Sequence, residues 1–203
     1  MKDITEYRGF WIKTEQDEDA TPPRENDNIG TMVCSHRRYI LGDIQDMCED
    51  EFDIIRNSSD YISLPIYMYE HSGITISTKP FSCPWDSGLV GMIYCSMKEA
   101  ETAYVDLYPE DELRKIVEEV LQEEVKEYDQ YLTGDVWCYS VYDKNPEENE
   151  DAIPLDSCCG FYGEEHCLEM AREFIDYRAN EKLKEFIPGM EPEELKKGTG
   201  NGN

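Results

Sequence analysis

The most regular pattern in this sequence is the alternation of apolar and polar side chains along residues 61–69. Ile62, Leu64, Ile66 and Met68 fall on one side, and a row rich in tyrosine falls on the other. A period of two predicts a half-buried strand, and Pro65 favours an edge position or a bulge within it. Weaker patterns of the same kind predict strands at 7–14 (interrupted by Gly9), 30–34, 73–78, 89–95, 135–142 and 153–159.

A period of 3.6 residues predicts the helices. The strongest runs from 109 to 128, because Pro109 and the acids after it suit a first turn and Gly134 follows as a stop signal. Its apolar face consists of Leu113, Ile116, Val117, Val120, Leu121, Val125 and Tyr128. Another long amphipathic helix is predicted at 164–186, and shorter ones at 43–55 and after the capping box at 96–99. The acidic segment 15–28 has no apolar period and predicts an exposed loop.

These elements predict an α+β fold. Strands occur in groups separated by short turns, and helices are inserted between the groups, without the regular alternation of a parallel α/β sheet. We therefore expect an antiparallel or mixed sheet with helices largely on one face. The length fits a single domain at 1–187, followed by a flexible tail at 188–203 that has little to bury.

The charge of the chain narrows its range of partners. Its 203 residues carry 46 acids against 19 lysines and arginines, a formal net charge of −27. Such a chain repels phosphate backbones and anionic lipid, so we expect neither direct nucleic-acid binding nor membrane association. No apolar stretch is long enough to span a bilayer and the N-terminus lacks a signal-peptide core, which favours a cytoplasmic protein. A basic partner is the natural complement, although the acidity could serve solubility alone.

Eight cysteines are present, at positions 34, 48, 83, 95, 138, 158, 159 and 167. No C-x-x-C pair occurs, and the adjacent Cys158 and Cys159 cannot easily share one tetrahedral site. We therefore expect free thiols that pack as small hydrophobes, with no metal and no cofactor.

Two sets of turn residues could carry enzyme chemistry. Cys83 would form a nucleophile pair with one of the three histidines, His36, His71 or His166, if the imidazole reached the thiol. Asp86, Asp135 and Asp156 lie in turns or at strand ends, where carboxylates could hold Mg²⁺ or Ca²⁺. Aspartate in a turn is also ordinary turn chemistry, so the structural interpretation competes with both.

Glu124 is a separate candidate, because it projects from the centre of the apolar stripe of the 109–128 helix. An unpaired carboxylate there would have a raised pKa and would mark a functional site. The favoured alternatives are a salt bridge to Arg37 or Arg38, or a helix end that has already emerged into water.

A function based on acidic surface requires fewer assumptions than either enzyme hypothesis. Nine acids and three bases lie between Glu110 and Asp129, on a helix roughly 30 Å long, over which duplex DNA carries about 18 charges. This helix alone carries less negative charge than DNA of that length. Together with the acidic segments 15–19, 49–53 and 147–151, its charge density would be comparable to that of DNA. We predict contacts with a basic partner at Glu118, Glu119, Glu123, Asp129, Glu147, Glu148, Glu150 and Asp151, with Tyr67 and Tyr69 as aromatic anchors.

Several blocks of the chain resemble a protein family carried by bacteriophages, plasmids and conjugative elements. They are DNIGTMVCSHRRYILGD, LPIYMYEHSGITISTKPFSCPWDSG, VGMIYCS, EVKEYDQYLTGDVW and DSCCGFYG, and the resemblance runs from about residue 24 to 167. The family supplies no catalytic residues to transfer, so the resemblance implies a context. Mobile elements that enter new hosts commonly encode small acidic proteins that disable defence nucleases, among them anti-CRISPR and anti-restriction proteins that act as DNA mimics.

Together these observations predict an inhibitor that binds the basic nucleic-acid channel of a host defence nuclease, such as a CRISPR effector, without catalysis. The alternative is a small hydrolase or nucleotide-processing enzyme with its site in the turns around His71, Cys83, Asp86 and Asp156.

Overall fold

A computed structural model describes residues 3–104, 107–149 and 151–186 of the chain. Two antiparallel sheets and four α-helices confirm the predicted α+β class. The chain forms two compact units: unit 1 draws on residues 1–18 and 136–203, and unit 2 on residues 19–135. Cooperative folding of both as the expected single domain stays a prediction, and the expected tail at 188–203 lies outside the described residues. None of the described helices has the length and hydropathy needed to cross a membrane.

Unit 1 is built from the two ends of the chain. Its sheet has the order β1-β2-β7-β8, with strands Asp3–Tyr7, Phe10–Gln16, Val136–Tyr142 and Asp156–Tyr162. The single strand predicted at 7–14 is wrong, because Arg8 and Gly9 adopt positive φ angles of 51° and 78°. Two consecutive residues of this kind make the tight turn that joins twisted antiparallel strands.

The helix α4, Glu164–Phe186, confirms the prediction at 164–186 and covers one face of this sheet. Alternate strand residues Ile12, Tyr139 and Val141 turn toward it and meet Ala171 and Ile175 in a buried cluster. The intervening residues of β2 and β7 therefore point to the opposite face, since side chains alternate along a strand.

Unit 2 is contiguous in sequence. Its sheet has the order β3-β6-β4-β5, with strands Thr31–Cys34, Ser87–Ser96, Tyr61–Glu70 and Ile74–Ser77. The short β5 pairs only with residues 67–70 of β4, so β4 has a free edge at Pro65, and the register shifts between Ile66 and Tyr67. Both features match the edge or bulge expected of Pro65.

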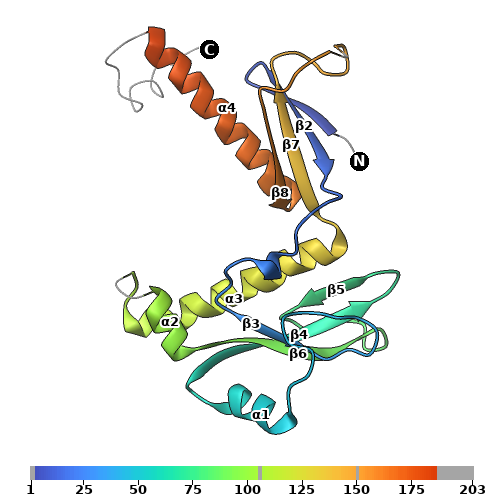
Figure 1. Cartoon of the computed structure of the whole chain (residues 1–203), viewed down its shortest axis with the longest axis vertical. Helices are drawn as coiled ribbons and strands as arrows, with labels where there is room; N and C mark the ends of the chain where they lie inside the picture. Colours follow the sequence, from blue (N-terminus) through green and yellow to red (C-terminus); the bar gives the residue numbers. More distant parts are fainter. Residues whose placement is uncertain (1–2, 105–106, 150, 187–203) are drawn as a thin grey trace. The chain divides into compact units, whose positions relative to one another are not determined.

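Helix α3, Glu110–Thr133, lies along one face of this sheet, and α1, Glu49–Asn57, lies on the other side (Figure 1). A short α2, Met97–Tyr104, and a single 3-10 turn, Pro23–Glu25, complete the unit. Gly134 ends α3 with a left-handed φ of 74°, as predicted, one turn later than the apolar pattern indicated.

The helix predicted at 43–55 begins only at Glu49. Residues 43 and 44 instead run beside β3: the Asp43 carboxylate accepts from the Met32 N–H at 2.7 Å, and the Ile44 carbonyl accepts from the Cys34 N–H at 3.0 Å. These bonds stabilise extended backbone and exclude a helix there.

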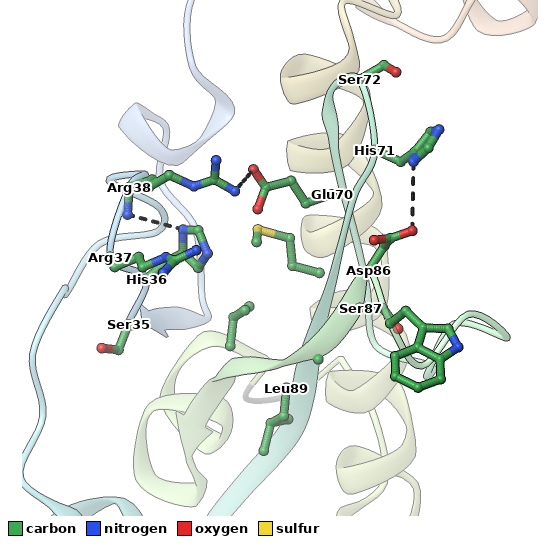
Figure 2. Close-up of a pocket in the computed structure, with 14 residues that line it drawn as sticks. Ser35, His36, Arg37, Arg38, Glu70, His71, Ser72, Asp86, Ser87 and Leu89 are labelled. Carbon is green, nitrogen blue, oxygen red and sulfur yellow. Dashed lines mark hydrogen bonds and ion pairs between the residues drawn. The ribbon is translucent and has the colours of Figure 1, made fainter.

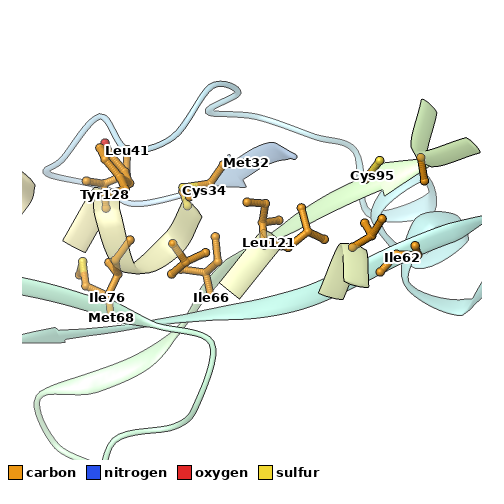
Figure 3. Packing of buried hydrophobic residues seen from close by; sticks show 14 of the residues in the cluster. Met32, Cys34, Leu41, Ile62, Ile66, Met68, Ile76, Cys95, Leu121 and Tyr128 are labelled. Atoms are coloured by element: carbon orange, nitrogen blue, oxygen red, sulfur yellow. The ribbon is translucent and has the colours of Figure 1, made fainter. Parts of the chain in front are cut away.

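The core of unit 2 lies between α3 and the sheet (Figure 3). Val117, Leu121 and Val125 are at most 1% exposed and pack against Ile62 and Ile66, which belong to the apolar side of the predicted alternation. Truncating a fully buried side chain such as Leu121 to alanine would cost about 2–5 kcal/mol.

Candidate functional site

Three polar turns of unit 2 meet at one end of its sheet. Strand β3 ends at Cys34, β4 ends at Glu70 and β6 begins at Ser87, and the antiparallel register places Cys34 opposite Gly91 and Tyr69 opposite Ser87. The segments attached at these points therefore surround one open pocket of about 640 Å³ (Figure 2). They belong to the sequence blocks SHRRY, YEHSG and CPWDSG.

One wall of the pocket carries the basic segment 36–38. Arg38 forms an ion pair with Glu70, and the Tyr39 hydroxyl donates to the same carboxylate at 3.1 Å. Burial raises the pKa of Glu70, but the hydrogen bonds and charge of these partners outweigh it, so the pKa is lowered. Arg37 is exposed and has no ion-pair partner within the described part of the chain.

The opposite wall holds two residues of the predicted enzyme site, His71 and Asp86, and Cys83 contacts Asp86 from outside the pocket lining. Asp86 Oδ2 lies 3.7 Å from His71 Nδ1, and the Cys83 thiol donates to the same oxygen at 3.7 Å. The acceptor for the thiol is therefore a carboxylate, and the nucleophile–imidazole contact that a Cys–His pair requires is not among these bonds. The exposed indole of Trp85, 92% accessible, adds a flat apolar surface to the pocket lining.

The remaining carboxylates of the enzyme hypothesis lie elsewhere. Asp156 belongs to unit 1, where it accepts from the Tyr139 hydroxyl at 2.8 Å. Asp135 accepts from the Gln130 amide at 3.1 Å at the end of α3. Neither joins the cluster of His71, Cys83 and Asp86.

Glu124 forms the ionic centre of unit 2. Its Oε2 accepts from Arg24 at 2.8 Å, and its Oε1 accepts from the backbone N–H groups of Ile29 and Gly30 at 2.9 and 3.1 Å. Arg24 also binds both oxygens of Asp43. A salt bridge was the favoured alternative for Glu124, but the partner is Arg24 rather than Arg37 or Arg38.

Arg24 also corrects the expectation that 15–28 is an exposed loop, because only 7% of its side chain is accessible. Burial lowers the pKa of this guanidinium, but its bonds to Asp43 and Glu124 raise the pKa above the ordinary value. It is the only base in that acidic segment, which was the one available signal for its role.

The acids of α3 do not form an unopposed charged face. Glu119 pairs with Lys115 at 3.5 Å, and Glu123 pairs with Lys126 at 2.7 Å. Asp129 accepts from the Thr75 hydroxyl and the Ile76 N–H, both at 2.7 Å, and so fixes β5. Glu118 is half-buried. Several of the acids predicted to contact a partner therefore form ion pairs or hydrogen bonds within unit 2 instead.

Among the exposed acids that have no basic partner in the described residues, two groups lie close together in sequence. One is α1, where Glu49, Asp50, Glu51 and Asp53 are exposed. The other is the β7–β8 loop of unit 1, where Glu147, Glu148 and Asp151 are exposed, whereas Glu150 lies outside the described residues.

A small groove of about 300 Å³ separates α1 from the outer face of its sheet. Phe52, Arg56, Pro65, Tyr67 and Leu89 are among the residues that line it. The predicted anchor Tyr67 thus lies at a groove beside the acidic helix. Tyr69, in contrast, packs between His71 and Phe81, with ring centroids 6.1 and 5.7 Å away.

The cysteines are partly as expected. Cys34, Cys95 and Cys167 are buried free thiols, and burial raises their pKa values to about 12, 11 and 12. Cys138 and Cys159, however, form a disulfide between β7 and β8, which corrects the expectation that all eight are free. Strand pairing brings these two residues together, and their sequence spacing carries no sign of it.

Comparison of this chain with protein-family models, curated proteins and solved structures finds no match.

Proposed function

We propose that this protein is an acidic inhibitor, encoded by a mobile element, that binds the basic nucleic-acid channel of a host defence nuclease such as a CRISPR effector. It would act in the cytoplasm of a bacterial host and without catalysis. The supporting observation is the pairing of four exposed acids on α1 with an apolar groove beside them.

This combination supplies two complementary parts of an interface. Exposed acids without basic partners attract lysine and arginine at long range, which speeds association but is weakened by salt. The groove lined by Phe52, Tyr67 and Leu89 offers a place for one apolar side chain of the partner. Aromatic residues next to such pockets are typical centres of binding energy.

The contact surface in this proposal differs from the one the sequence favoured. Glu119 and Glu123 already neutralise lysines, and Asp129 holds β5. Charges that are satisfied within one helix contribute little to attraction of a partner, because the field of each pair cancels at a distance. We therefore assign the larger role in partner binding to the α1 acids, and a second contact of the same kind to the β7–β8 loop of unit 1.

The test is inhibition of DNA cleavage by a purified, guide-loaded CRISPR effector. We expect inhibition to weaken steeply between about 50 and 200 mM salt, as for other polyanion contacts. The double variant Asp50→Lys/Asp53→Lys should raise the inhibitory concentration about tenfold or more. Its matched control, Glu119→Lys/Glu123→Lys, changes the net charge by the same amount and should have a much smaller effect.

An equal loss of inhibition in the two double variants would show that net charge alone determines inhibition, and it would contradict the assignment of the contact surface to α1. Inhibition of no nuclease in a panel of CRISPR and restriction enzymes, at low salt, would reject the function itself.

A second candidate is a small hydrolase or nucleotide-processing enzyme at the 640 Å³ pocket. It is favoured by the convergence of three turns: Asp86 contacts both Cys83 and His71, the exposed Trp85 lies in the same pocket lining, and Arg37 lines the opposite wall. Cations and an indole suit a ligand that combines phosphate with a planar base. Asp86→Asn should abolish turnover of such a substrate, whereas a binding surface loses affinity gradually.

A further inference from the structure

The open face of the unit 1 sheet carries a cluster that plays no part in the proposed function. Residues Ile12, Tyr139 and Val141 turn toward α4, so Cys138, between Tyr139 and Trp137, points to the opposite face. Glu15 pairs with Cys138 in the register, and the Asp17 N–H donates to the Val136 carbonyl at 2.8 Å. Asp17 therefore lies diagonally across from Cys138 on the same face.

Cys159 on β8 completes the cluster. Its sulfur is bonded to that of Cys138, and a carboxylate oxygen of Asp17 and both sulfurs all lie within 4.8 Å of one another. Asp17 and Cys138 are half-buried and Cys159 is exposed, so the cluster is accessible from solvent. Its neighbour Cys158 is opposite Tyr139 in the register and so belongs to the other face.

We propose that Cys138, Cys159 and Asp17 bind one zinc ion when the disulfide is reduced, with water as the fourth ligand. Zinc in proteins accepts both thiolate sulfur and carboxylate oxygen as ligands, and thiolates select it over Mg²⁺ and Ca²⁺. In a tetrahedron with Zn–S bonds of about 2.3 Å the two sulfurs lie about 3.8 Å apart, so the sulfurs of the reduced pair have to move apart from their bonded positions.

The reduced sulfurs have to separate, and the strand pairing allows this. The register of β7 and β8 shifts between Trp137 and Tyr139, so Cys138 lies at an irregularity on its β8 side, while it keeps its regular pairing with Glu15 of β2. At such an irregularity the ladder is already locally disrupted, and bulges commonly alter the direction of a side chain. The net charge of −27 adds a general attraction for cations.

Zinc binding first requires reduction of the disulfide, for which a dithiol or a phosphine is the reductant. Two electrons from the reductant and two protons from solvent convert the disulfide into two thiols. Zinc then replaces the two thiol protons, which are released to solvent, so that binding strengthens as the pH rises. The oxidised and zinc-bound forms exclude each other.

Cobalt(II) added to the full-length protein under a phosphine reductant tests the site. We expect a sulfur-to-cobalt charge-transfer band and the visible bands of tetrahedral cobalt, both saturating at one equivalent and lost on addition of zinc. Cys159→Ser should lose the charge-transfer intensity of one thiolate and bind far more weakly. Cys158→Ser, one position away on the opposite face, should behave as wild type.

Absence of the bands in the reduced wild type, or their retention at full strength in Cys159→Ser, would overturn the proposal. If Cys159→Ser does not fold, alkylation of the wild type decides the question. Zinc should then protect Cys138 and Cys159 but not Cys158, and equal labelling of all three by mass spectrometry would reject the site. Asp17→Asn, which keeps both thiols, should weaken binding and shift the visible bands.

Discussion

The two units have the same packing arrangement, but different interactions hold their segments together. Each rests one long amphipathic helix on a four-stranded antiparallel sheet, with Leu121 of α3 and Ile175 of α4 fully buried at the contact. Unit 2 ties its N-terminal segment to the core through charges, because Arg24 joins Asp43 to Glu124. Unit 1 uses the covalent Cys138–Cys159 link between neighbouring strands.

This difference predicts different sensitivities. An ionic centre depends on every partner being present and charged, since a single remaining charge in a partly buried place is costly. A disulfide is indifferent to charge but depends on redox conditions. Each unit should therefore respond to a perturbation that leaves the other unchanged.

Removal of Arg24 should have the largest effect. Arg24→Ala leaves Glu124, whose side chain is 10% exposed, without its cation and should cost unit 2 about 3–5 kcal/mol. Urea denaturation with hydrogen exchange resolved by residue would locate the loss in β3 and α3, with α4 unchanged. Lys115→Ala, which removes a base from an exposed pair on α3, should cost less than about 0.5 kcal/mol. An equal loss in both units would mean that they unfold as one.

Reduction of the disulfide should have a somewhat smaller effect, confined to unit 1. The bond closes a sequence separation of 21 residues, and chain-entropy arguments give a stabilisation of about 3 kcal/mol for a loop of this size. Reductant, in the absence of metal, should lower the denaturation midpoint of β7 and α4. The double variant Cys138→Ser/Cys159→Ser should start at the lower midpoint and show no response to reductant. A shift in the unit 2 midpoint would contradict the comparison.

Acid should produce the smallest effect, at the pocket of unit 2. Because the pKa of Glu70 is lowered in the folded protein, its pairing with Arg38 stabilises the fold above the unfolded pKa. That contribution is lost as the pH falls through the folded pKa. The Arg38 and Tyr39 amide resonances should therefore shift in an NMR titration below the ordinary pKa of glutamate. Glu70→Gln should remove the shift, and a midpoint at or above the ordinary value would refute this account.

Most helices and strands could be predicted from the sequence, and so could many of the residues that each contributes to the core. Apolar periodicity identified both long helices, and alternation identified the β4 residues that face α3, because burial selects side chains position by position. It could not separate the hairpin β1–β2 from a single strand, since both halves have the same alternation. Gly9 was the only local sign of the turn.

The site depended on contacts between distant segments, which periodicity does not contain. Nothing local distinguishes Arg24 from Arg37 as a partner for Glu124, and the choice follows from the path of residues 19–30 across α3. The pairing of Cys138 with Cys159 likewise depends on the pairing of β7 with β8, at the point where the register of these strands shifts. The turns at 36, 71 and 86 could be named from composition, but their meeting at one end of the sheet required the strand order.

The division of unit 1 between the two ends of the chain has a consequence for synthesis. The β1–β2 hairpin leaves the ribosome before unit 2, yet the strand that covers the exposed edge of β2 is β7, which follows the whole of unit 2. At translation rates of about 5–20 residues per second, β2 waits on the order of 10 s for its partner. Unit 2 is contiguous and can complete its sheet during that interval, so the nascent hairpin is the part of this protein that most needs protection from premature strand pairing.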